Sequence, residues 1–199
     1  MKPVKKFVFG RREPDLPMEL TAAAEASALF EACDVSITDR RIEGLKIAGG
    51  GFGSIKLKDV RLEGCDLANL ETRGLTLVRV EFVNCKMTGF RAGEADCLDV
   101  FFSESDLRYS QFRFSKFRSA EFESCNFEEA DFQGTDLSGA IFRKCNLHGA
   151  EMSKVKLVNA DLRGSRVEGL QLNAEDIRGA IVDASQAMIF APLLGIRIA

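Results

Sequence analysis

Cysteine is the residue type whose spacing in this chain most resembles a chemical site. Four of the six cysteines are separated by multiples of twenty residues, namely Cys65, Cys85, Cys125 and Cys145. A zinc site would need ligands that converge on a tetrahedron, often from pairs about two to four residues apart. The four cysteines lack that spacing, and Cys33 and Cys97 add no partner. We therefore predict no metal site, and free thiols that pack as small hydrophobic side chains.

A glycine-rich stretch and a single histidine are the remaining candidates for cofactor binding or catalysis. The stretch GGGFGS at 49–54 resembles a phosphate-binding loop but lacks the G-x-x-x-x-G-K-[ST] pattern. His148 has no serine or cysteine partner by spacing, and the carboxylates are spread out rather than gathered in a cleft that would shift their pKa values. We predict no catalytic residue and no cofactor, and we expect that the protein is not an enzyme.

The composition excludes several classes of partner. The chain has 199 residues, of which 46% are hydrophobic and 29% charged, enough for a sizeable core. A net charge of -3 gives no basic field, so we expect no direct binding to nucleic acid. No stretch is long and apolar enough to span a membrane, and the start lacks the apolar region of a signal peptide. We therefore expect a cytoplasmic protein with reduced thiols.

A five-residue period must position all of these side chains. Stepping by five from Ala32 to Val182 gives 31 positions, here called centres, of which 27 are Leu, Ile, Phe, Met or Val. The residue two before each centre is small from Ala95 to Ser165, and the residue between them is mostly polar. This in-out alternation is typical of a β-strand, so both the centre and the small residue should face a core.

The two residues after each centre should form a corner. Glycine recurs as the second of them, at positions including Gly74, Gly134 and Gly139, where a positive φ costs glycine little. All four prolines lie outside residues 30–184, as expected if main-chain N–H groups there pair with neighbouring coils.

This A-(D/N)-(L/F)-x-x pattern resembles the pentapeptide-repeat family, with ADFQG at 130–134, TDLSG at 135–139 and ADLRG at 160–164 as close matches. The resemblance implies an all-β solenoid, a right-handed quadrilateral parallel β-helix in which four pentapeptides form one coil. The 31 pentapeptides would then make about eight coils. Residues twenty apart should stack in columns, and one such column carries phenylalanine at four levels: Phe82, Phe102, Phe122 and Phe142.

The open ends of such a rod need caps, because exposed strand edges invite aggregation. We predict an N-terminal, partly helical cap over residues 1–29, a β-helix over 30–184, and a C-terminal capping or dimerisation helix and tail over 185–199. Asp15 is the expected cap of a helix over 18–29. Asp183 or Ser185 should start the C-terminal helix, and Gly195 should end it.

The outward position before each centre is the most informative for function. Only Phe101, Ile141 and Ile181 are large and apolar there, and all three fall on one face in a fourfold geometry. Acidic residues alternate with them in the same column. We call this column the wall: Glu81, Phe101, Glu121, Ile141, Asp161 and Ile181. An apolar and acidic strip on a rigid face could bind a protein partner. The alternative is that a terminal segment folds over it, the C-terminal helix lying beside Ile181.

The final segment, GAIVDASQAMIFAPLLGIRIA, is similar to the C-terminal ends of Qnr and MfpA-type pentapeptide-repeat proteins, which protect DNA gyrase from quinolones. In those relatives this helix joins two rods, and the dimer imitates DNA. The resemblance implies a homodimer surface at Met188, Ile189, Phe190, Leu193 and Leu194. A helix that caps a monomer is the alternative.

Three hypotheses for function follow. The first is a noncatalytic, homodimeric protein-binding rod whose partner is unidentified. The second is a DNA-mimicking modulator of DNA gyrase or another type II topoisomerase, and the third a self-immunity or regulatory factor for another enzyme. A net charge of only -5 over residues 30–184 and an uninterrupted array without projecting loops favour the first.

Overall fold

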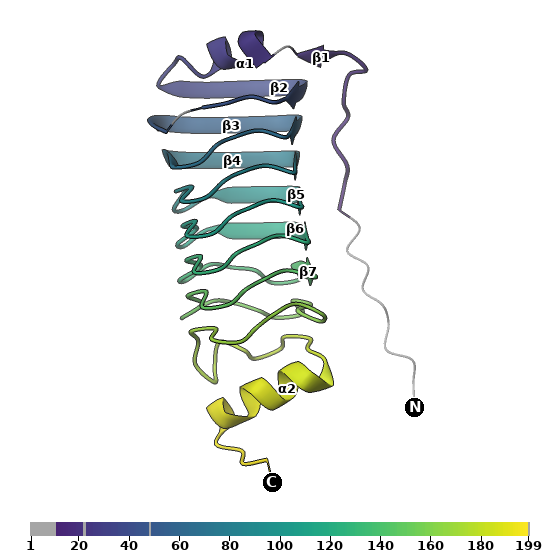
Figure 1. Ribbon diagram of the computed structural model, residues 1–199, viewed down its shortest axis with the longest axis vertical. Helices are drawn as coiled ribbons and strands as arrows, with labels where there is room; N and C mark the ends of the chain where they lie inside the picture. The colour runs from purple at the N-terminus through teal and green to yellow at the C-terminus, as the bar shows by residue number, and fades with distance from the viewer. Residues whose placement is uncertain (1–10, 22, 48, 199) are drawn as a thin grey trace.

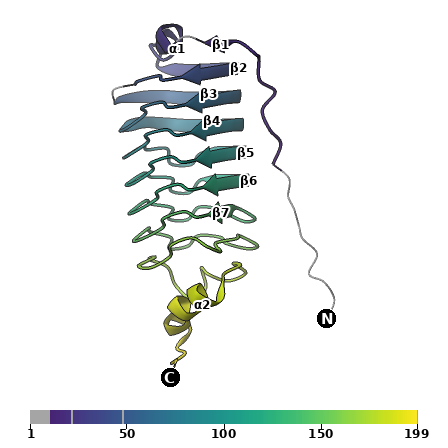
Figure 2. The ribbon, with the colours of Figure 1, turned by 45° about the vertical axis from the view of Figure 1, so that its right-hand side comes forward.

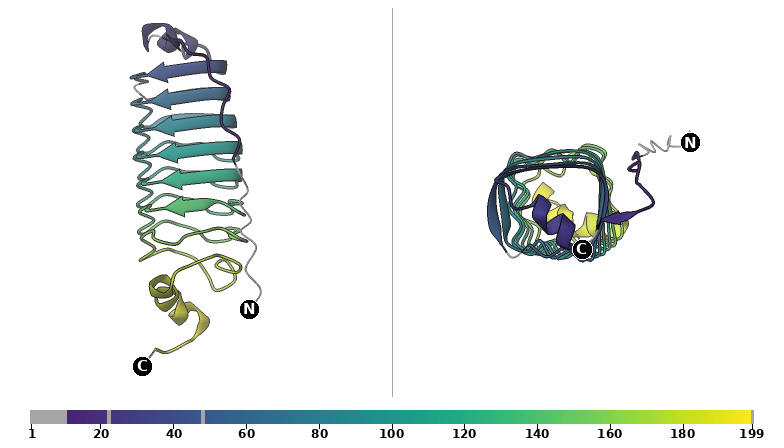
Figure 3. Two further views of the ribbon diagram at one scale, coloured as in Figure 1. Left: turned by 90° about the vertical axis from the view of Figure 1, so that its right-hand side faces the viewer. Right: turned by 90° about the horizontal axis from the view of Figure 1, so that it is seen from above.

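The alternating inward and outward residues form short parallel strands, which the computed structural model stacks into one rod (Figures 1 and 2). The structure describes residues 11–21, 23–47 and 49–198. The first ten residues of the predicted N-terminal cap therefore lie outside the described residues. Seen from above, the coils have a roughly square outline, with α1 over one end and α2 over the other (Figure 3).

The described residues contain one seven-stranded parallel sheet in the order β1 to β7. Its strands are β1 (Leu20–Thr21), β2 (Asp34–Glu43), β3 (Gly50–Glu63), β4 (Leu70–Val83), β5 (Asp96–Ser103), β6 (Lys116–Glu123) and β7 (Ile141–Arg143). The helices are α1 (Ala23–Leu29), α2 (Ala184–Phe190) and the 3-10 helix η1 (Ala191–Leu194). None of the helices among the described residues has both the length and the apolar character needed to cross a membrane.

From β2 to β7, each paired residue of the sheet lies opposite the residue twenty positions later, as the sequence predicts, whereas β1 pairs with β2 at a separation of 21 residues. Phe82 pairs with Phe102, which pairs with Phe122, and isolated bridges continue the same register to Ile181. Main-chain hydrogen bonds join the coils between the strands as well, for example from Leu67 N–H to the Lys86 carbonyl at 2.8 Å. The parallel β-solenoid is therefore confirmed. Its right-handed sense and its count of about eight coils stay predictions.

The core is filled by the centres and by the small residues between them. The predicted phenylalanine column is confirmed: the rings of Phe122 and Phe142 are stacked with centroids 4.6 Å apart, and Phe82 and Phe102 lie 4.7 Å apart. Stacked aromatic pairs add roughly 0.5–1.5 kcal/mol each to the stabilisation from burial alone. Most inward hydroxyls bond to main-chain carbonyls, as Thr135 Oγ1 does to Phe112 at 2.6 Å and Ser115 Oγ does to Ala92 at 3.3 Å, whereas the buried Ser110 hydroxyl makes no hydrogen bond.

The corners adopt the predicted left-handed conformation in most repeats, with or without glycine. In the described part of the chain, sixteen residues other than glycine have a positive φ, all at this corner position, and they include Tyr109 and Phe114. The left-handed region costs such residues roughly 1–2 kcal/mol each. Main-chain hydrogen bonds between neighbouring coils at the same residues, such as Tyr109 N–H to the Glu128 carbonyl at 3.1 Å, offset that strain. Gly74 is an exception to the prediction, because it continues strand β4 and has no positive φ.

The N-terminal helix begins later than predicted. Met18 is exposed, Leu20 and Thr21 form β1 against Arg41 and Ile42, and α1 starts only at Ala23. Asp15 does not cap this helix, because α1 begins eight residues later at Ala23; the Asp15 main-chain N–H instead donates to Asp59. The reason is that the first coil exposes a strand edge, and pairing with β1 satisfies the hydrogen-bonding groups of that edge.

Two glycine corners test how a contact with the neighbouring coil affects stability. Gly134 and Gly139 both have a positive φ, but a Cβ at Gly134 would lie 2.6 Å from Cδ1 of Phe114, whereas one at Gly139 meets nothing within 4 Å. We expect Gly139→Ala to cost about 1 kcal/mol, and Gly134→Ala about 1 kcal/mol more. Urea unfolding measures both. In a Phe114→Ala background the two costs should become equal, and a persistent difference would contradict the packing argument.

Candidate functional site

Five of the six cysteines are part of the core. Cys65, Cys85, Cys97, Cys125 and Cys145 are free and buried, and Cys33 is free and exposed. The Sγ of Cys85 donates to the Leu62 carbonyl at 3.4 Å, and Cys145 makes the same bond to Phe122. Burial raises the pKa of the Cys97 thiol far above its ordinary value, so this group stays protonated. Within the described ranges, no three His, Cys, Asp or Glu side chains are grouped as metal ligands would be.

The other chemical candidates are also structural. Gly50 to Ser54 belong to strand β3, where the Phe52 ring packs edge-on against Phe30 at 6.0 Å. The Nδ1 atom of His148 lies 2.8 Å from the Glu168 carbonyl in the next coil. Because that oxygen can only accept, Nδ1 must carry the proton of this hydrogen bond.

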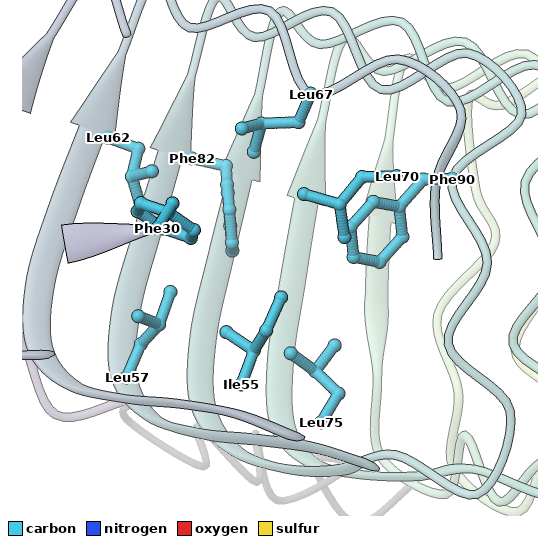
Figure 4. A pocket seen from close by; sticks show the side chains of 9 residues that line it. All are labelled: Phe30, Ile55, Leu57, Leu62, Leu67, Leu70, Leu75, Phe82 and Phe90. Carbon is cyan, nitrogen blue, oxygen red and sulfur yellow. The ribbon is translucent and has the colours of Figure 1, made fainter. Parts of the chain in front are cut away.

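An apolar cavity of about 20 Å³ lies in the core near the N-terminal end (Figure 4). Its lining consists of Phe30, Ile55, Leu57, Leu62, Leu67, Leu70, Leu75, Phe82 and Phe90. A space of this size holds about one water molecule, and it offers no polar partner for one. We interpret it as a packing gap rather than a ligand site.

The wall forms one continuous outward column, as the register predicts. Glu81 pairs with Phe101 and Glu121 with Ile141 in adjacent strands, and a bridge joins Asp161 to Ile181. Ile181 is 42% exposed, whereas Glu81 is buried although it points outward. A buried carboxylate on the outside of a rod must be covered by another part of the chain.

That cover is the N-terminal segment over residues 11–17, here called the strap, which runs along the side of the rod (Figure 3). Arg11 Nη1 lies 3.0 Å from Glu81 Oε1, and the Arg11 guanidinium lies 4.9 Å from the Phe101 ring centroid. Arg61 Nη1 donates to the other oxygen of Glu81 at 3.0 Å. A terminal segment therefore covers the first two residues of the wall, Glu81 and Phe101. It is the N-terminal segment, whereas the sequence suggested the C-terminal helix.

Two corner carboxylates beside the wall hold the main chain of the strap. Arg12 N–H donates to Asp99 Oδ1 at 3.3 Å, and Asp15 N–H donates to Asp59 Oδ1 at 3.2 Å. Arg79 also binds Asp59 in a bidentate pair, with both N···O distances at 2.6 Å. This pairing with Arg79, together with the Asp15 N–H, holds the pKa of Asp59 below its ordinary value despite burial. The carboxylate is therefore ionised at neutral pH and fully partnered.

Among the described residues, the other two acidic side chains of the wall are paired with arginines of the rod. Arg143 Nη1 lies 3.4 Å from Glu121, and Arg163 forms a bidentate pair with Asp161. The Arg163 pair lowers the pKa of Asp161. Both arginine side chains are more than half exposed, so another charged group could displace them at little cost.

The C-terminal end is closed by α2. Of the two residues predicted to start the helix, Asp183 and Ser185, Asp183 is its N-cap. It also forms a reciprocal capping box with Gln186. Hydrogen bonds from Ser185 and from the main-chain N–H groups of Gln186 and Gly164 lower the pKa of Asp183 to about 2. Pro192 lies at the start of η1, and Gly195 ends it with a φ of 72°. The α-helix itself therefore ends at Phe190, earlier than predicted, and the 3-10 helix η1 continues to the predicted stop at Gly195.

Gln186 was not recognised from the sequence, yet it closes the last coil. Its side chain is buried, and Nε2 donates to the carbonyls of Leu162 and Ser165 at 2.7 Å each. Of the five residues predicted as a dimer surface, Phe190 is only 5% exposed and packs against the core, because it plugs the open end of the rod. The other four are exposed: Met188, Ile189, Leu193 and Leu194.

Two family models match the repeated region. A model of pentapeptide repeats matches residues 125–164 with eight copies, and a model of the pentapeptide repeat region matches residues 55–132. No curated protein sequence matches the chain.

Several solved structures are similar over much of the rod. The pentapeptide-repeat protein Rfr23 from the cyanobacterium Cyanothece 51142 is 15% identical, with a TM-score of 0.42, over 62% of this chain and 91% of that chain. A trypsin-treated variant of QnrB1, described as a plasmid-mediated fluoroquinolone resistance protein, is 21% identical, with a TM-score of 0.42, over 83% and 84%. A pentapeptide-repeat protein from the thylakoid lumen of Arabidopsis thaliana is 23% identical, with a TM-score of 0.36, over 49% and 72%.

The role of Gln186 can be tested by Gln186→Leu. Removing the amide leaves the Ser165 carbonyl without its side-chain donor and the Asp183 N–H without its acceptor, while the Leu162 carbonyl keeps the Ser165 N–H. We therefore expect the free energy of unfolding to fall by about 1–3 kcal/mol in urea denaturation. Gln171→Leu is the matched control, because Gln171 is exposed and makes only a long bond of 3.4 Å to Gly149. It should change stability by less than about 0.5 kcal/mol. Equal effects of the two substitutions would show that Gln186 does not close the coil.

Proposed function

Because the chain belongs to the pentapeptide-repeat family, we propose that it is a noncatalytic rod that binds a partner protein along the wall and pairs with a second copy through its C-terminal end. The observation that carries the proposal is the alternation of acidic and apolar residues in the wall. The fold needs only polar or small side chains at these outward positions. Phe101, Ile141 and Ile181 depart from that pattern, and apolar groups in a row on an outer face are typical of protein-binding surfaces.

The part of the wall beyond the strap is the available surface. Ile141 is half-buried and Ile181 exposed, Asp161 lies between them in register, and Glu121 lies one coil before Ile141. The parallel strands and bridges hold these side chains on a rigid frame, so the rod would lose little conformational entropy when a partner binds.

The C-terminal end supports a homodimer. Met188 and Leu194 are each more than half exposed, and Ile196 and Ile198 extend the same apolar end of the chain. Apolar side chains gathered at the end of a rod would be buried if a second rod docked there. Phe190 is excluded from this surface, because it already packs inside its own rod.

Light scattering coupled to size-exclusion chromatography tests the dimer. We expect about twice the chain mass of 21.9 kDa at micromolar concentration. Met188→Asp with Leu194→Asp should give the monomer mass, because charges would be buried in the interface. Leu29→Asp, which changes an exposed apolar residue at the opposite end, is the control and should remain dimeric. A monomer mass for the unaltered chain would refute the dimer.

A DNA-mimicking modulator of DNA gyrase or another type II topoisomerase is the narrower alternative. Its support is the exposed apolar C-terminal end, since two rods joined there would make one object of twice the length. The charge distribution favours general protein binding, because basic and acidic side chains alternate between coils. Lys86 pairs with Asp66 at 3.2 Å, and Lys156 with Asp136 at 3.6 Å, which leaves a mixed rather than a uniformly negative surface.

Affinity capture from a cytoplasmic extract of the source cells tests the wall. We expect the unaltered rod to retain specific proteins and Ile141→Asp with Ile181→Asp to recover them at roughly tenfold lower yield. Val158→Asp is the control, because Val158 is an exposed aliphatic residue in a different column. Identical protein sets from all three rods would refute binding by the wall.

A supercoiling assay with purified DNA gyrase separates the two functions. The general protein-binding proposal expects no change in supercoiling, with or without a quinolone. Inhibition of supercoiling, or protection from the drug, would replace it with the topoisomerase alternative.

A further inference from the structure

The wall repeats one chemical unit three times. Each unit is a carboxylate followed one coil later by an apolar side chain, and the units are Glu81 with Phe101, Glu121 with Ile141, and Asp161 with Ile181. Successive units are forty residues apart in the sequence, which is two coils. With about 4.8 Å between coils, equivalent groups lie about 9.6 Å apart along the rod.

The first unit already has an occupant, which shows what the unit binds. Arg11 places its charge 3.0 Å from Glu81 and its guanidinium over the Phe101 ring, and its side chain is only 10% exposed. Glu81 accommodates this arginine although it also binds Arg61, because each guanidinium takes a different carboxylate oxygen. A wall acid that is paired within the rod can therefore accept a second arginine from outside.

The strap also shows the conformation that fits. Arg12 N–H and Asp15 N–H bind carboxylates at Asp99 and Asp59, which are two coils apart. Three residues of the strap therefore span about 9.6 Å, or about 3.2 Å per residue, close to the rise of a polyproline II helix. Pro14 and Pro17 favour this extended backbone in the residues before them.

A polyproline II helix has about three residues per turn, so every third side chain lies on the same face, about 9.3 Å apart. That repeat matches the distance between units of the wall. A β-strand would place residues three apart on opposite faces, and only one of them could reach the wall.

We propose that the wall is a recognition surface for an extended, polyproline II-like segment of a partner protein with arginine at every third residue. The strap is the intramolecular ligand of its first unit and competes with the partner there. Arginine is preferred to lysine, because a planar guanidinium can stack on Phe101 in the first unit, and because its forked donors match a carboxylate at the two isoleucine units. The inference rests on the proposed protein-binding function and adds the chemistry of the partner.

Binding of synthetic peptides, followed by fluorescence anisotropy on the full chain, tests the proposal. The probe is a labelled nine-residue peptide of three Arg-Ala-Pro triplets. Two further peptides serve as comparisons: one of the same composition with its three arginines consecutive, and one with lysine in place of each arginine. We expect the spaced arginine peptide to bind at least about fivefold more tightly than either, because only it places a guanidinium at every unit.

Competition by the strap is tested with Arg11→Gln. This change removes the ion pair to Glu81 and the contact with Phe101 but leaves the rod unaltered, so the spaced peptide should bind about tenfold more tightly than to the unaltered chain. Glu121→Gln with Ile141→Ala should weaken that binding by roughly tenfold, whereas Val158→Ala should leave it unchanged. Circular dichroism and thermal unfolding verify that each variant is folded.

Equal binding of the spaced and consecutive arginine peptides would overturn the proposal, since it would indicate simple charge attraction. Equal affinity for the unaltered chain and Arg11→Gln would refute competition by the strap. The capture experiment with Ile141→Asp and Ile181→Asp tests protein binding by the wall separately from both of these results. Loss of a captured protein there, with no preference among the peptides, would refute only the arginine spacing.

Discussion

The register between coils is the constraint on which the rest of the structure depends. Main-chain hydrogen bonds join each coil to the coils before and after it, as from Asp66 N–H to Leu45 and from Leu67 N–H to Lys86. Because inward and outward residues alternate, a slip of one residue would expose the phenylalanine column and bury charged side chains. The period therefore fixes which side chains form columns, and columns such as Phe122 on Phe142 in turn stabilise the period.

The sequence predicts the parts of the structure that repeat. The phenylalanine stack, the buried cysteines and the left-handed corners each occur in one environment many times, so a single residue pattern identifies them. Asp183 is also predictable, because a helix cap depends on residues close in sequence. Gly74 shows the limit, since it occupies the corner position but continues a strand.

The parts that occur once could not be predicted, because they depend on distant residues. The strap contacts Glu81 and Asp99, which are 70 and 87 residues away from Arg11 and Arg12, and no local pattern in residues 11–17 indicates those partners. Gln186 likewise bonds to Leu162 and Ser165 only because α2 lies across the last coil. Phe190 was assigned to an outer surface from resemblance, but the open end of the rod provides a larger apolar surface for it to cover.

The contacts of the strap also explain how an interaction surface can be built on a rod without destabilising it. Glu81 is buried, and a buried carboxylate is costly unless it is paired and hydrogen-bonded. Arg61 donates a hydrogen bond to it from the rod itself, and Arg11 adds an ion-pair contact from the strap in which Arg11 Nη1 makes no hydrogen bond. If the strap is replaced by an arginine of another protein, the charge pairing is exchanged rather than lost, and the column keeps its register. Such an exchange requires little net free energy, so the affinity for a partner would be set by the apolar contacts and by how well its spacing matches the coils.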